Sequence, residues 1–309
     1  MRSLATRKRN PLEQTTIDNR KYALDKWLYP FFGARTLGEI NNLAIRDLVE
    51  HMSTLSAAAI RDYSNITKAV VASAVDENGE EQYPRKWNDE YIDAPPVVKQ
   101  HQPTIDVAGI NSLLETTSGR GRMLLALLAG CGPLRAGEAL GLEIKHVSED
   151  RRTLYIRQKA KRGKAQNFLK TQAGERDIDL SIELASFLHQ YIGNRTSGFV
   201  FATTSGRAWG QRNALRDCLY SAQRRTGLPE EGFNIFRRFR ITRVRKLDCP
   251  RELQHFWSGH AQEHVSERYT KLQEDRAYRL DWAEKIGAGF TIPKYVGLRS
   301  LRFMTSRVA

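Results

Sequence analysis

The chain has 309 residues, 40% of them hydrophobic, which is enough for two domains with separate cores. No segment reaches the roughly 18 apolar residues of a membrane-spanning helix, and the basic N-terminus lacks the apolar region of a secretory signal. Cys131, Cys218 and Cys249 are too widely spaced for a metal site. We therefore predict a cytoplasmic protein with reduced thiols and no membrane partner. The formal net charge of +14 favours a polyanion, and we predict a nucleic acid.

The first part of the chain is predicted to form a basic arm and a small helical domain. Residues 1–14 form the arm, and apolar residues recur at helical spacing through most of residues 15–95. Asn42 and Ser56 are the expected N-caps of the second and third helices of this domain. Prolines and polar residues then mark an interdomain linker at 96–104. The helical domain fits either a generic helical bundle or one half of a clamp around DNA.

The second part, residues 105–285, is predicted to be helical around a small antiparallel sheet. The run 122–130 is strongly apolar and predicts a helix that is buried on most sides. Segments 153–158 and 177–180 read as strands. Further helices are expected over 107–116, from about 134 onwards, and over 181–193, 210–226, 235–247, 250–257 and 261–284. The predicted fold class is therefore mainly α, with an α+β second domain, and residues 286–309 form a C-terminal tail.

Arg135 follows a Gly-Pro break and opens a predicted helix, with Glu138 one turn later. The i,i+3 spacing places the carboxylate and the guanidinium on one face of that helix. Two interpretations remain open from these residues alone. The pair is an ordinary surface ion pair, worth roughly 0–1 kcal/mol, or the arginine is held for a phosphate group and steadied by its acidic neighbour.

Three further stretches contain residues suited to phosphate chemistry. Lys170 begins a turn that leads into the second predicted strand, although lysines in such turns are usually only solvated. Arg237 lies in an arginine-rich helix start, which otherwise predicts a basic face against a DNA backbone. Gly259 and His260 precede Tyr269, whose place in a helical run is also typical of a half-buried packing residue.

In this order, the five residues resemble the catalytic set of the tyrosine recombinases, the phage-type integrases. The resemblance covers residues 105 to 275, and more loosely the helical domain before them. Its motifs are the box around Arg135 with Glu138, the pair Lys170-Thr171 with Gly174 and Arg176 before a short strand, the position of Arg237, the Gly259-His260 pair, and Tyr269 nine residues after His260. The resemblance implies a helical core-type DNA-binding domain over 15–95 and a catalytic domain over 105–285.

Two features depart from the family's pattern. The family usually has a histidine three residues before the second arginine, and this chain has Asn234 there. An amide donates a hydrogen bond but cannot exchange a proton near neutral pH, so the substitution puts the rate of cleavage in doubt. Many phage integrases also carry an extra N-terminal domain that binds arm-type DNA sites. Because only residues 1–14 precede the first predicted helix, we expect that domain to be missing.

The resemblance implies a mechanism of DNA cleavage. Arg135 and Arg237 would hold the scissile phosphate and bind it more tightly as charge grows in the transition state. Tyr269 would attack the phosphorus to form a 3′-phosphotyrosyl bond and a free 5′-hydroxyl, and Lys170 would protonate that leaving oxygen.

The remaining site residues have supporting roles in this scheme. His260, and more weakly Asn234, would donate hydrogen bonds to phosphate oxygens, and Glu138 would orient Arg135 or a neighbour. Because the bond energy is kept in the phosphotyrosine, no ATP, metal ion or other cofactor is expected. The sequence also has no P-loop, GxGxxG or H-E-x-x-H motif.

The family further implies several partners. We expect a double-stranded DNA recombination site, a homotetramer on two duplexes, and accessory DNA-bending or directionality proteins. The expected location is the cytoplasm of a bacterial or phage-infected cell, at the nucleoid. The tail at 286–309 is predicted to dock on a neighbouring protomer, and packing on its own domain is the alternative.

Three other functions fit parts of the sequence. A DNA-binding protein descended from a recombinase, with impaired cleavage, would explain Asn234. A type IB topoisomerase-like activity would use the same chemistry, and neither the two-domain size nor the lysine motif separates it from recombination. A generic basic protein without chemistry would explain the charge alone.

Overall fold

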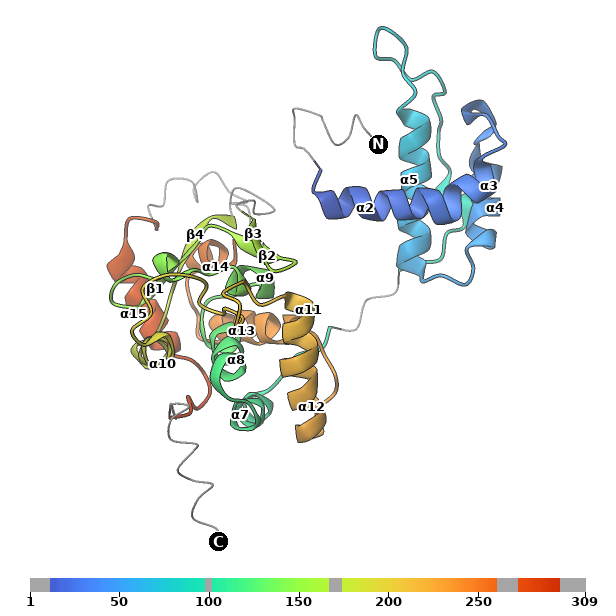
Figure 1. Cartoon of the computed structure of the whole chain (residues 1–309). Helices are drawn as coiled ribbons and strands as arrows, with labels where there is room; N and C mark the ends of the chain where they lie inside the picture. The colour runs from blue at the N-terminus through green and yellow to red at the C-terminus, as the bar shows by residue number, and fades with distance from the viewer. Residues whose placement is uncertain (1–11, 98–101, 167–173, 260–271, 295–309) are drawn as a thin grey trace. The chain divides into compact units, whose positions relative to one another are not determined.

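The computed structural model describes residues 12–97, 102–166, 174–259 and 272–294. The chain divides into two compact units, Met1–His101 and Gln102–Ala309 (Figure 1). Each unit has a hydrophobic core of its own, which is the property that makes a segment a domain. None of the helices in the described part of the chain has the length and apolar character needed to cross a membrane.

The first unit is helical and packs around the apolar faces of α4 and α5. Its elements in chain order are α2 (Gln14–Ala23), the π-helical segment η1 (Leu24–Leu28), α3 (Tyr29–Phe32), the 3₁₀ turn η2 (Leu37–Glu39), α4 (Asn42–His51), α5 (Ala57–Ala72) and α6 (Asp89–Ile92). Ile45 and Leu48 of α4 and Ile60 and Val71 of α5 are almost completely buried. The two residues of α4 are three positions apart and those of α5 are eleven positions apart, so each pair lies on one face of its helix and forms part of this core.

The N-caps of α4 and α5 show one shift from the prediction. Asn41 caps α4, because its side-chain oxygen accepts a hydrogen bond from the amide three residues on. Asn42 is instead the first residue of α4, and its side chain bonds the backbone of Lys86 at 3.2 Å and of Asn88 at 3.0 Å. Ser56 caps α5 as predicted. Both asparagines are suitable N-cap residues. Because the side chain of Asn42 binds the backbone of residues 86–88, Asn41 serves as the N-cap.

The second unit is also mainly helical and contains all four strands of the described chain. Its elements are α7 (Val107–Thr116), α8 (Gly119–Gly130), α9 (Ala136–Leu140), η3 (Ile144–His146), β1 (Thr153–Ile156), β2 (Lys159–Lys161), β3 (Lys164–Gln166), β4 (Arg176–Asp179), α10 (Ile182–Ile192), α11 (Gln211–Ala214), η5 (Leu215–Tyr220), α12 (Ser221–Thr226), α13 (Asn234–Lys246), α14 (Arg251–Ser258) and α15 (Arg276–Ile286). The predicted fold class, mainly α with a small antiparallel sheet, is confirmed.

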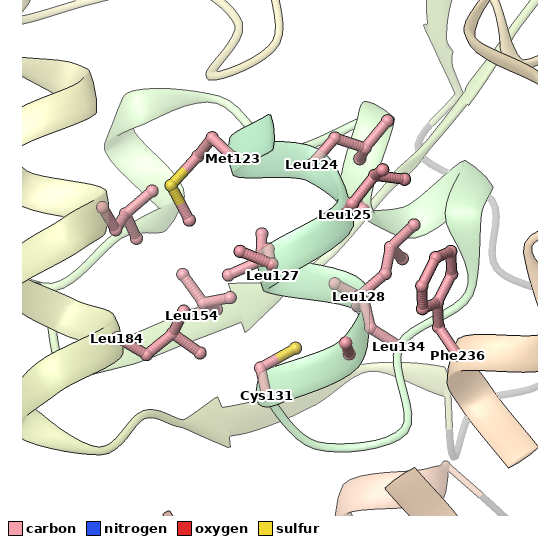
Figure 2. Close-up of a cluster of buried hydrophobic side chains, with 14 of the residues drawn as sticks. Met123, Leu124, Leu125, Leu127, Leu128, Cys131, Leu134, Leu154, Leu184 and Phe236 are labelled. Atoms are coloured by element: carbon pink, nitrogen blue, oxygen red, sulfur yellow. The ribbon is translucent and has the colours of Figure 1, made fainter. Parts of the chain in front are cut away.

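Helix α8 is the centre of this unit's core. Every residue from Met123 to Gly130 is buried, as the apolar run predicted. Figure 2 shows the side chains of α8 surrounded by Leu154 of β1, Leu184 of α10 and Phe236 of α13. Because α13 packs directly on α8, the helix that carries Arg237 is fixed against the chain that leads into the turn before Arg135.

The strands form two antiparallel pairs rather than one sheet. β1 pairs with β4, with Thr153 opposite Asp179 and Ile156 opposite Arg176. β2 and β3 form a separate hairpin between the two predicted strands, where no strand was predicted beyond residue 158. The hairpin turns at Arg162 and Gly163, which both have positive φ angles, the conformation that closes a tight two-residue β-turn. Its strands have three residues each, too few to show alternation in the sequence.

The predicted helix over 261–284 is wrong in part. Residues 260–271 lie outside the described residues, but 272–275 form turns and not helix. Helix α15 begins at Arg276, and the side chain of Asp275 caps it by accepting from the amide of Tyr278 at 3.0 Å. An acidic N-cap of this kind starts a new helix rather than continuing an old one.

The predicted tail begins as part of the second unit's core. Ile286 is fully buried at the end of α15. Arg240 donates to the carbonyl of Gly287 at 2.7 Å, and Arg243 donates to that of Ile286 at 2.8 Å. These guanidiniums satisfy carbonyls that the end of a helix leaves without partners. Residues 295–309 lie outside the described residues, so docking of the tail on a second protomer stays a prediction.

Candidate active site

The site is built around the start of α9, where Arg135 is the N-cap residue. Its backbone amide donates to Glu138 Oε2 at 2.9 Å, and its Nη1 donates to Glu138 Oε1 at 2.9 Å. The carboxylate of Glu138 therefore accepts from both the backbone amide and the side chain of the N-cap residue Arg135. The i,i+3 spacing read from the sequence produces this contact directly.

Glu138 is not part of an ordinary surface ion pair, because it is buried between two arginines. Arg176, the first residue of β4, places its Nη2 2.8 Å from Glu138 Oε2. The side chains of Glu138 and Arg176 are 5% and 1% exposed, whereas that of Arg135 is 43% exposed. Burial by itself would raise the pKa of Glu138, but the charges and hydrogen bonds of Arg176 and Arg135 together outweigh burial and hold the pKa below its usual value. Glu138 is therefore ionised at neutral pH and holds the guanidinium of Arg135 from the buried side of the site.

Arg237 of α13 joins the start of α9 to the end of α14. Its Nη1 donates to the carbonyl of Pro133, and its Nη2 donates to the carbonyl of Ser258 at 3.0 Å. Burial, together with the positive charge of Arg135, lowers the pKa of Arg237 to about 10. The guanidinium is still protonated at neutral pH, and its binding to Pro133 keeps it near the start of α9.

The chain before Arg135 approaches its neighbours more closely than most residues would allow. A Cβ on Gly132 would lie 2.9 Å from Ile178 Cγ2 of β4 and 3.2 Å from Trp257 Cβ of α14. The Gly-Pro break read from the sequence is thus a close approach of three segments as well as the end of a helix. It sets the carbonyl of Pro133 where Arg237 can reach it.

The end of α14 is held by the same arginines. Arg176 Nε donates to the carbonyl of Trp257 at 2.7 Å, and Arg237 binds the next carbonyl, that of Ser258. Gly259 ends the helix in the left-handed conformation, at φ 62°. The backbone directly before His260 is therefore fixed beside Arg176 and Arg237.

The structure brings some predicted site residues together, and others lie outside the described residues. Arg135 and Arg176 form ion pairs with Glu138, and Arg237 contacts Pro133, two residues before Arg135. Asn234 is the exposed first residue of α13, one helical turn before Arg237. The predicted residues Lys170, His260 and Tyr269 lie outside the described residues.

Arg176 is the site residue that sequence reasoning missed. It was noted only as part of the motif that contains Lys170, and an arginine at the start of a short strand is normally expected to face water. Its place in the motif six residues after Lys170 could have marked it as a site residue. A single sequence does not show that it pairs with Glu138, 38 residues earlier.

The cluster is suited to binding an anion with two negative oxygens. Arg135 and Arg176 both bind the carboxylate of Glu138, and Arg237 brings a third guanidinium to the chain just before Arg135. A guanidinium presents its N–H groups as a planar fork that matches the oxygens of a phosphate. No group of three or more His, Cys, Asp or Glu side chains that could hold a metal ion occurs within the described ranges.

Comparisons with known proteins identify the family of the chain and two structures with a similar fold. Residues 104–276 match the model of the phage integrase family. The integrase of the Tn1549 transposon, solved in complex with a circular intermediate DNA, has a TM-score of 0.67 at 16% identity, over 98% of this chain and 96% of that chain. A lambda integrase dimer bound to a COC′ core site has a TM-score of 0.60 at 14% identity, over 87% and 74% of the two chains. A search of curated proteins finds no match. At these identities the two structures show a shared fold.

Proposed function

Since the chain belongs to the phage integrase family, we propose that it is a site-specific DNA recombinase that cuts and rejoins double-stranded DNA through a 3′-phosphotyrosine intermediate. The observation that carries the proposal is that Arg237 binds the carbonyl of Pro133, two residues before Arg135, whose own guanidinium is held by the buried carboxylate of Glu138. The two arginines come from segments about a hundred residues apart. Glu138 fixes Arg135, and the carbonyls of Pro133 and Ser258 fix Arg237, so we propose that the two guanidiniums are preorganised for a phosphate. The net charge of +14 supports binding to DNA.

In the proposed reaction, the scissile phosphate lies between Arg135 and Arg237. Arg135 supplies the more exposed guanidinium, and Glu138 keeps it oriented from the buried side. Arg237 is held by two backbone carbonyls and does not need to reorganise when charge develops on the phosphate. Interactions that are already in place are the ones that stabilise a transition state most strongly.

Tyr269 is the proposed nucleophile. Its oxygen forms a bond to phosphorus and loses its proton, while the bond from phosphorus to the 5′-oxygen breaks. Lys170 gives a proton to that oxygen, so a 5′-hydroxyl is released. One phosphate ester is broken and one is formed, and attack by the 5′-hydroxyl of another strand reverses the step. His260 and Asn234 are proposed as hydrogen-bond donors to the phosphate oxygens.

The proposed partners follow from the family. We propose a double-stranded recombination site as substrate, four protomers on two duplexes as the active assembly, and accessory DNA-bending or directionality proteins. The proposed place of action is the cytoplasm, at the nucleoid. The helical first unit is proposed as the core-type DNA-binding domain over 15–95, and 105–285 as the catalytic domain.

The proposal is tested by trapping the covalent intermediate. Fragments from the flanks of the protein's own gene are first selected by gel shift, nicked close to the cleavage position, and then incubated with wild type or with Tyr269→Phe. Because a nick lets the small 5′-hydroxyl fragment diffuse away, the covalent complex accumulates. We expect an adduct on a denaturing gel with wild type and none with Tyr269→Phe, while both proteins shift the fragment equally.

A DNA-binding descendant with impaired cleavage is the second candidate, and Asn234 is the observation that favours it. It predicts equal gel shifts and no adduct from wild type, which would refute the recombinase. A type IB topoisomerase-like activity predicts instead that the protein relaxes any supercoiled plasmid, without a sequence requirement.

A further inference from the structure

A cavity of about 410 Å³ lies in the second unit, between the turn that leads into β1 and the exposed side of α10. One wall is the turn 149–152. The other wall is a stripe of α10 that recurs at helical spacing, formed by Ile182, Ala185, Ser186, His189 and Gln190. The volume falls in the range of binding sites for small organic molecules. Among the described residues, no member of the candidate active site lines this cavity.

Arg151 lines the cavity with a guanidinium that is incompletely bonded. In the part of the chain that the structure describes, its Nε is buried and has no hydrogen-bond partner. Such a donor costs free energy, because it has lost water and gained no acceptor. The side chain as a whole is only partly buried. A rotation of the guanidinium towards the cavity would relieve the cost if an acceptor lay there.

The backbone of Arg151 gives a second reason to expect a function for its side chain. Its φ angle is 60°, in the left-handed region that glycine adopts freely and other residues adopt at a cost. The turn fixes this angle, because the amide of Arg151 donates to the carbonyl of Ser148 at 2.9 Å. Glycine would close the same turn without that cost. The arginine therefore adds nothing to the turn itself.

The charged residues on either side of Arg151 already have partners. Asp150 Oδ2 accepts from Arg276 Nη2 at 2.6 Å, and Arg152 Nη2 donates to Glu284 Oε2 at 2.9 Å. These ion pairs neutralise the carboxylate before Arg151 and the guanidinium after it. The positive charge of Arg151 is thus the charge that the inner part of this turn offers to an occupant of the cavity.

The other lining groups indicate what kind of molecule would fit. Ser186, His189 and Gln190 bring hydrogen-bonding side chains, and Ile182, which is 56% exposed, brings a nonpolar surface. Glu149 also lines the cavity, but it is exposed and water screens its charge. A guanidinium matches the paired oxygens of a carboxylate or a phosphate with its planar fork. The complement of this cavity is a molecule with one oxyanion group and a nonpolar part.

We propose that this cavity binds a small organic oxyanion, a carboxylate or a phosphate ester, through the guanidinium of Arg151. The nonpolar part of the ligand lies against Ile182 of α10. The inference goes beyond the proposed function, because the cavity is lined by none of the described residues assigned to DNA cleavage. It also needs no cleavage for its test, so the covalent-trapping experiment and this one fail separately.

The test uses three probes that share one ring. Phenyl phosphate and benzoate carry a phosphate and a carboxylate, and benzyl alcohol carries no anion. The measurement is the ring signals of His189 in NMR spectra of the histidine-labelled full chain, assigned by their loss in His189→Gln. Because His189 lines the cavity, its signals separate binding here from binding of an anion to Arg135 or Arg237.

We expect at least one of the two anions to shift the His189 signals with a dissociation constant on the order of 1 mM. Benzyl alcohol should bind at least about tenfold more weakly, because it lacks the charge-assisted hydrogen bonds. A response to phenyl phosphate alone identifies a phosphate ester as the ligand class, and a response to benzoate alone identifies a carboxylate. No response to either anion up to about 20 mM overturns the inference.

Arg151→Gly should weaken binding of the anion at least about tenfold. Arg162→Gly is the matched control, because Arg162 also has a positive φ angle, 51°, in a turn but does not line the cavity. Its variant should bind the anion within about twofold of wild type. Equal binding by Arg151→Gly and wild type overturns the inference.

Thermal unfolding without ligand separates a binding role of Arg151 from a structural one. Glycine suits the left-handed angle, so Arg151→Gly should melt at or above the temperature of wild type. If the side chain of Arg151 instead held the turn together, the variant would melt at a lower temperature. A fall of more than about 4 °C, the size expected for the loss of a stabilising contact in a domain of this size, overturns the inference.

Discussion

Replacing Glu138 by glutamine tests whether the candidate site depends on one buried charge. The carboxylate accepts from the amide and Nη1 of Arg135 and from Nη2 of Arg176, all at 2.8–2.9 Å. Glutamine has nearly the same shape but no charge and a single acceptor oxygen. The variant leaves the guanidinium of Arg176, 1% exposed, without its counter-ion. Removing one partner of a buried pair costs more than the pair contributes, because the remaining charge is desolvated.

The expected loss is about 3 kcal/mol of unfolding free energy, the lower end for a broken buried ion pair, because glutamine keeps one hydrogen bond. For a domain of 150–250 residues this corresponds to a fall in melting temperature of about 6–12 °C. The control is Asp281→Asn, which breaks the exposed pair with Lys285 on α15 and should change stability by less than about 0.5 kcal/mol.

The pH dependence gives the same prediction an independent check. The pKa of Glu138 is lower in the folded protein than in the unfolded chain, so its contribution is complete above the unfolded pKa of about 4.3. It is lost as the pH falls through the lower, folded pKa. The difference in stability between wild type and Glu138→Gln should therefore be constant from pH 8 to about pH 5 and shrink in more acidic solution.

Urea unfolding of wild type, Glu138→Gln and Asp281→Asn, followed by circular dichroism at several pH values, measures both effects. If Glu138→Gln unfolds at the same urea concentration as Asp281→Asn, Glu138 is not the counter-ion of a buried arginine, and the reasoning fails. A difference that persists unchanged at acidic pH, where the carboxylate is protonated, would refute the charge as its cause.

Three other substitutions probe separate parts of the second unit. Arg237→Lys should slow adduct formation by about 100-fold with little change in DNA affinity, since a lysine cannot match the arginine's fork; a loss of under about threefold would contradict its proposed role. Because the pKa of Arg237 is about 10, its protonation should not alter the wild-type rate between pH 6 and 8. Gly141→Ala should destabilise the protein by about 1–3 kcal/mol in urea, because the new Cβ would lie 2.7 Å from the backbone of Lys159 and Ala160. Asn234→His should raise the adduct rate by about tenfold or more, if proton exchange at this position limits cleavage; an unchanged rate would show that it does not.

Helix positions could be predicted where packing follows a periodic pattern. The apolar run of α8 and the spacing around α7 predicted both helices close to their observed bounds. The contact of Arg135 with Glu138 could also be predicted, because both atoms belong to one turn of one helix. In each of these cases the information lies within a few residues of sequence, and local geometry converts it into structure.

The contacts that complete the site could not be predicted in this way. Arg237 meets Pro133 and Ser258, which lie 104 residues before it and 21 residues after it. These bonds are to backbone carbonyls, which every residue has, so no side-chain type marks them in the sequence. The order of Arg135 and Arg237 in a family-like pattern indicated that they belong together, but it did not indicate which backbone groups hold them.

Strand β4 shows why a correct strand prediction can still give the wrong surroundings. The alternation around Ile178 predicts one buried face and one solvated face, with the aspartates in water. In the structure Ile178 is buried in the core, and Asp177 and Asp179 are also buried, because α14 and α15 cover their face. Covering acidic side chains is favourable only where arginine and other donors meet them, and Arg279 supplies that charge from 100 residues away. A buried aspartate in a strand therefore predicts a distant basic partner.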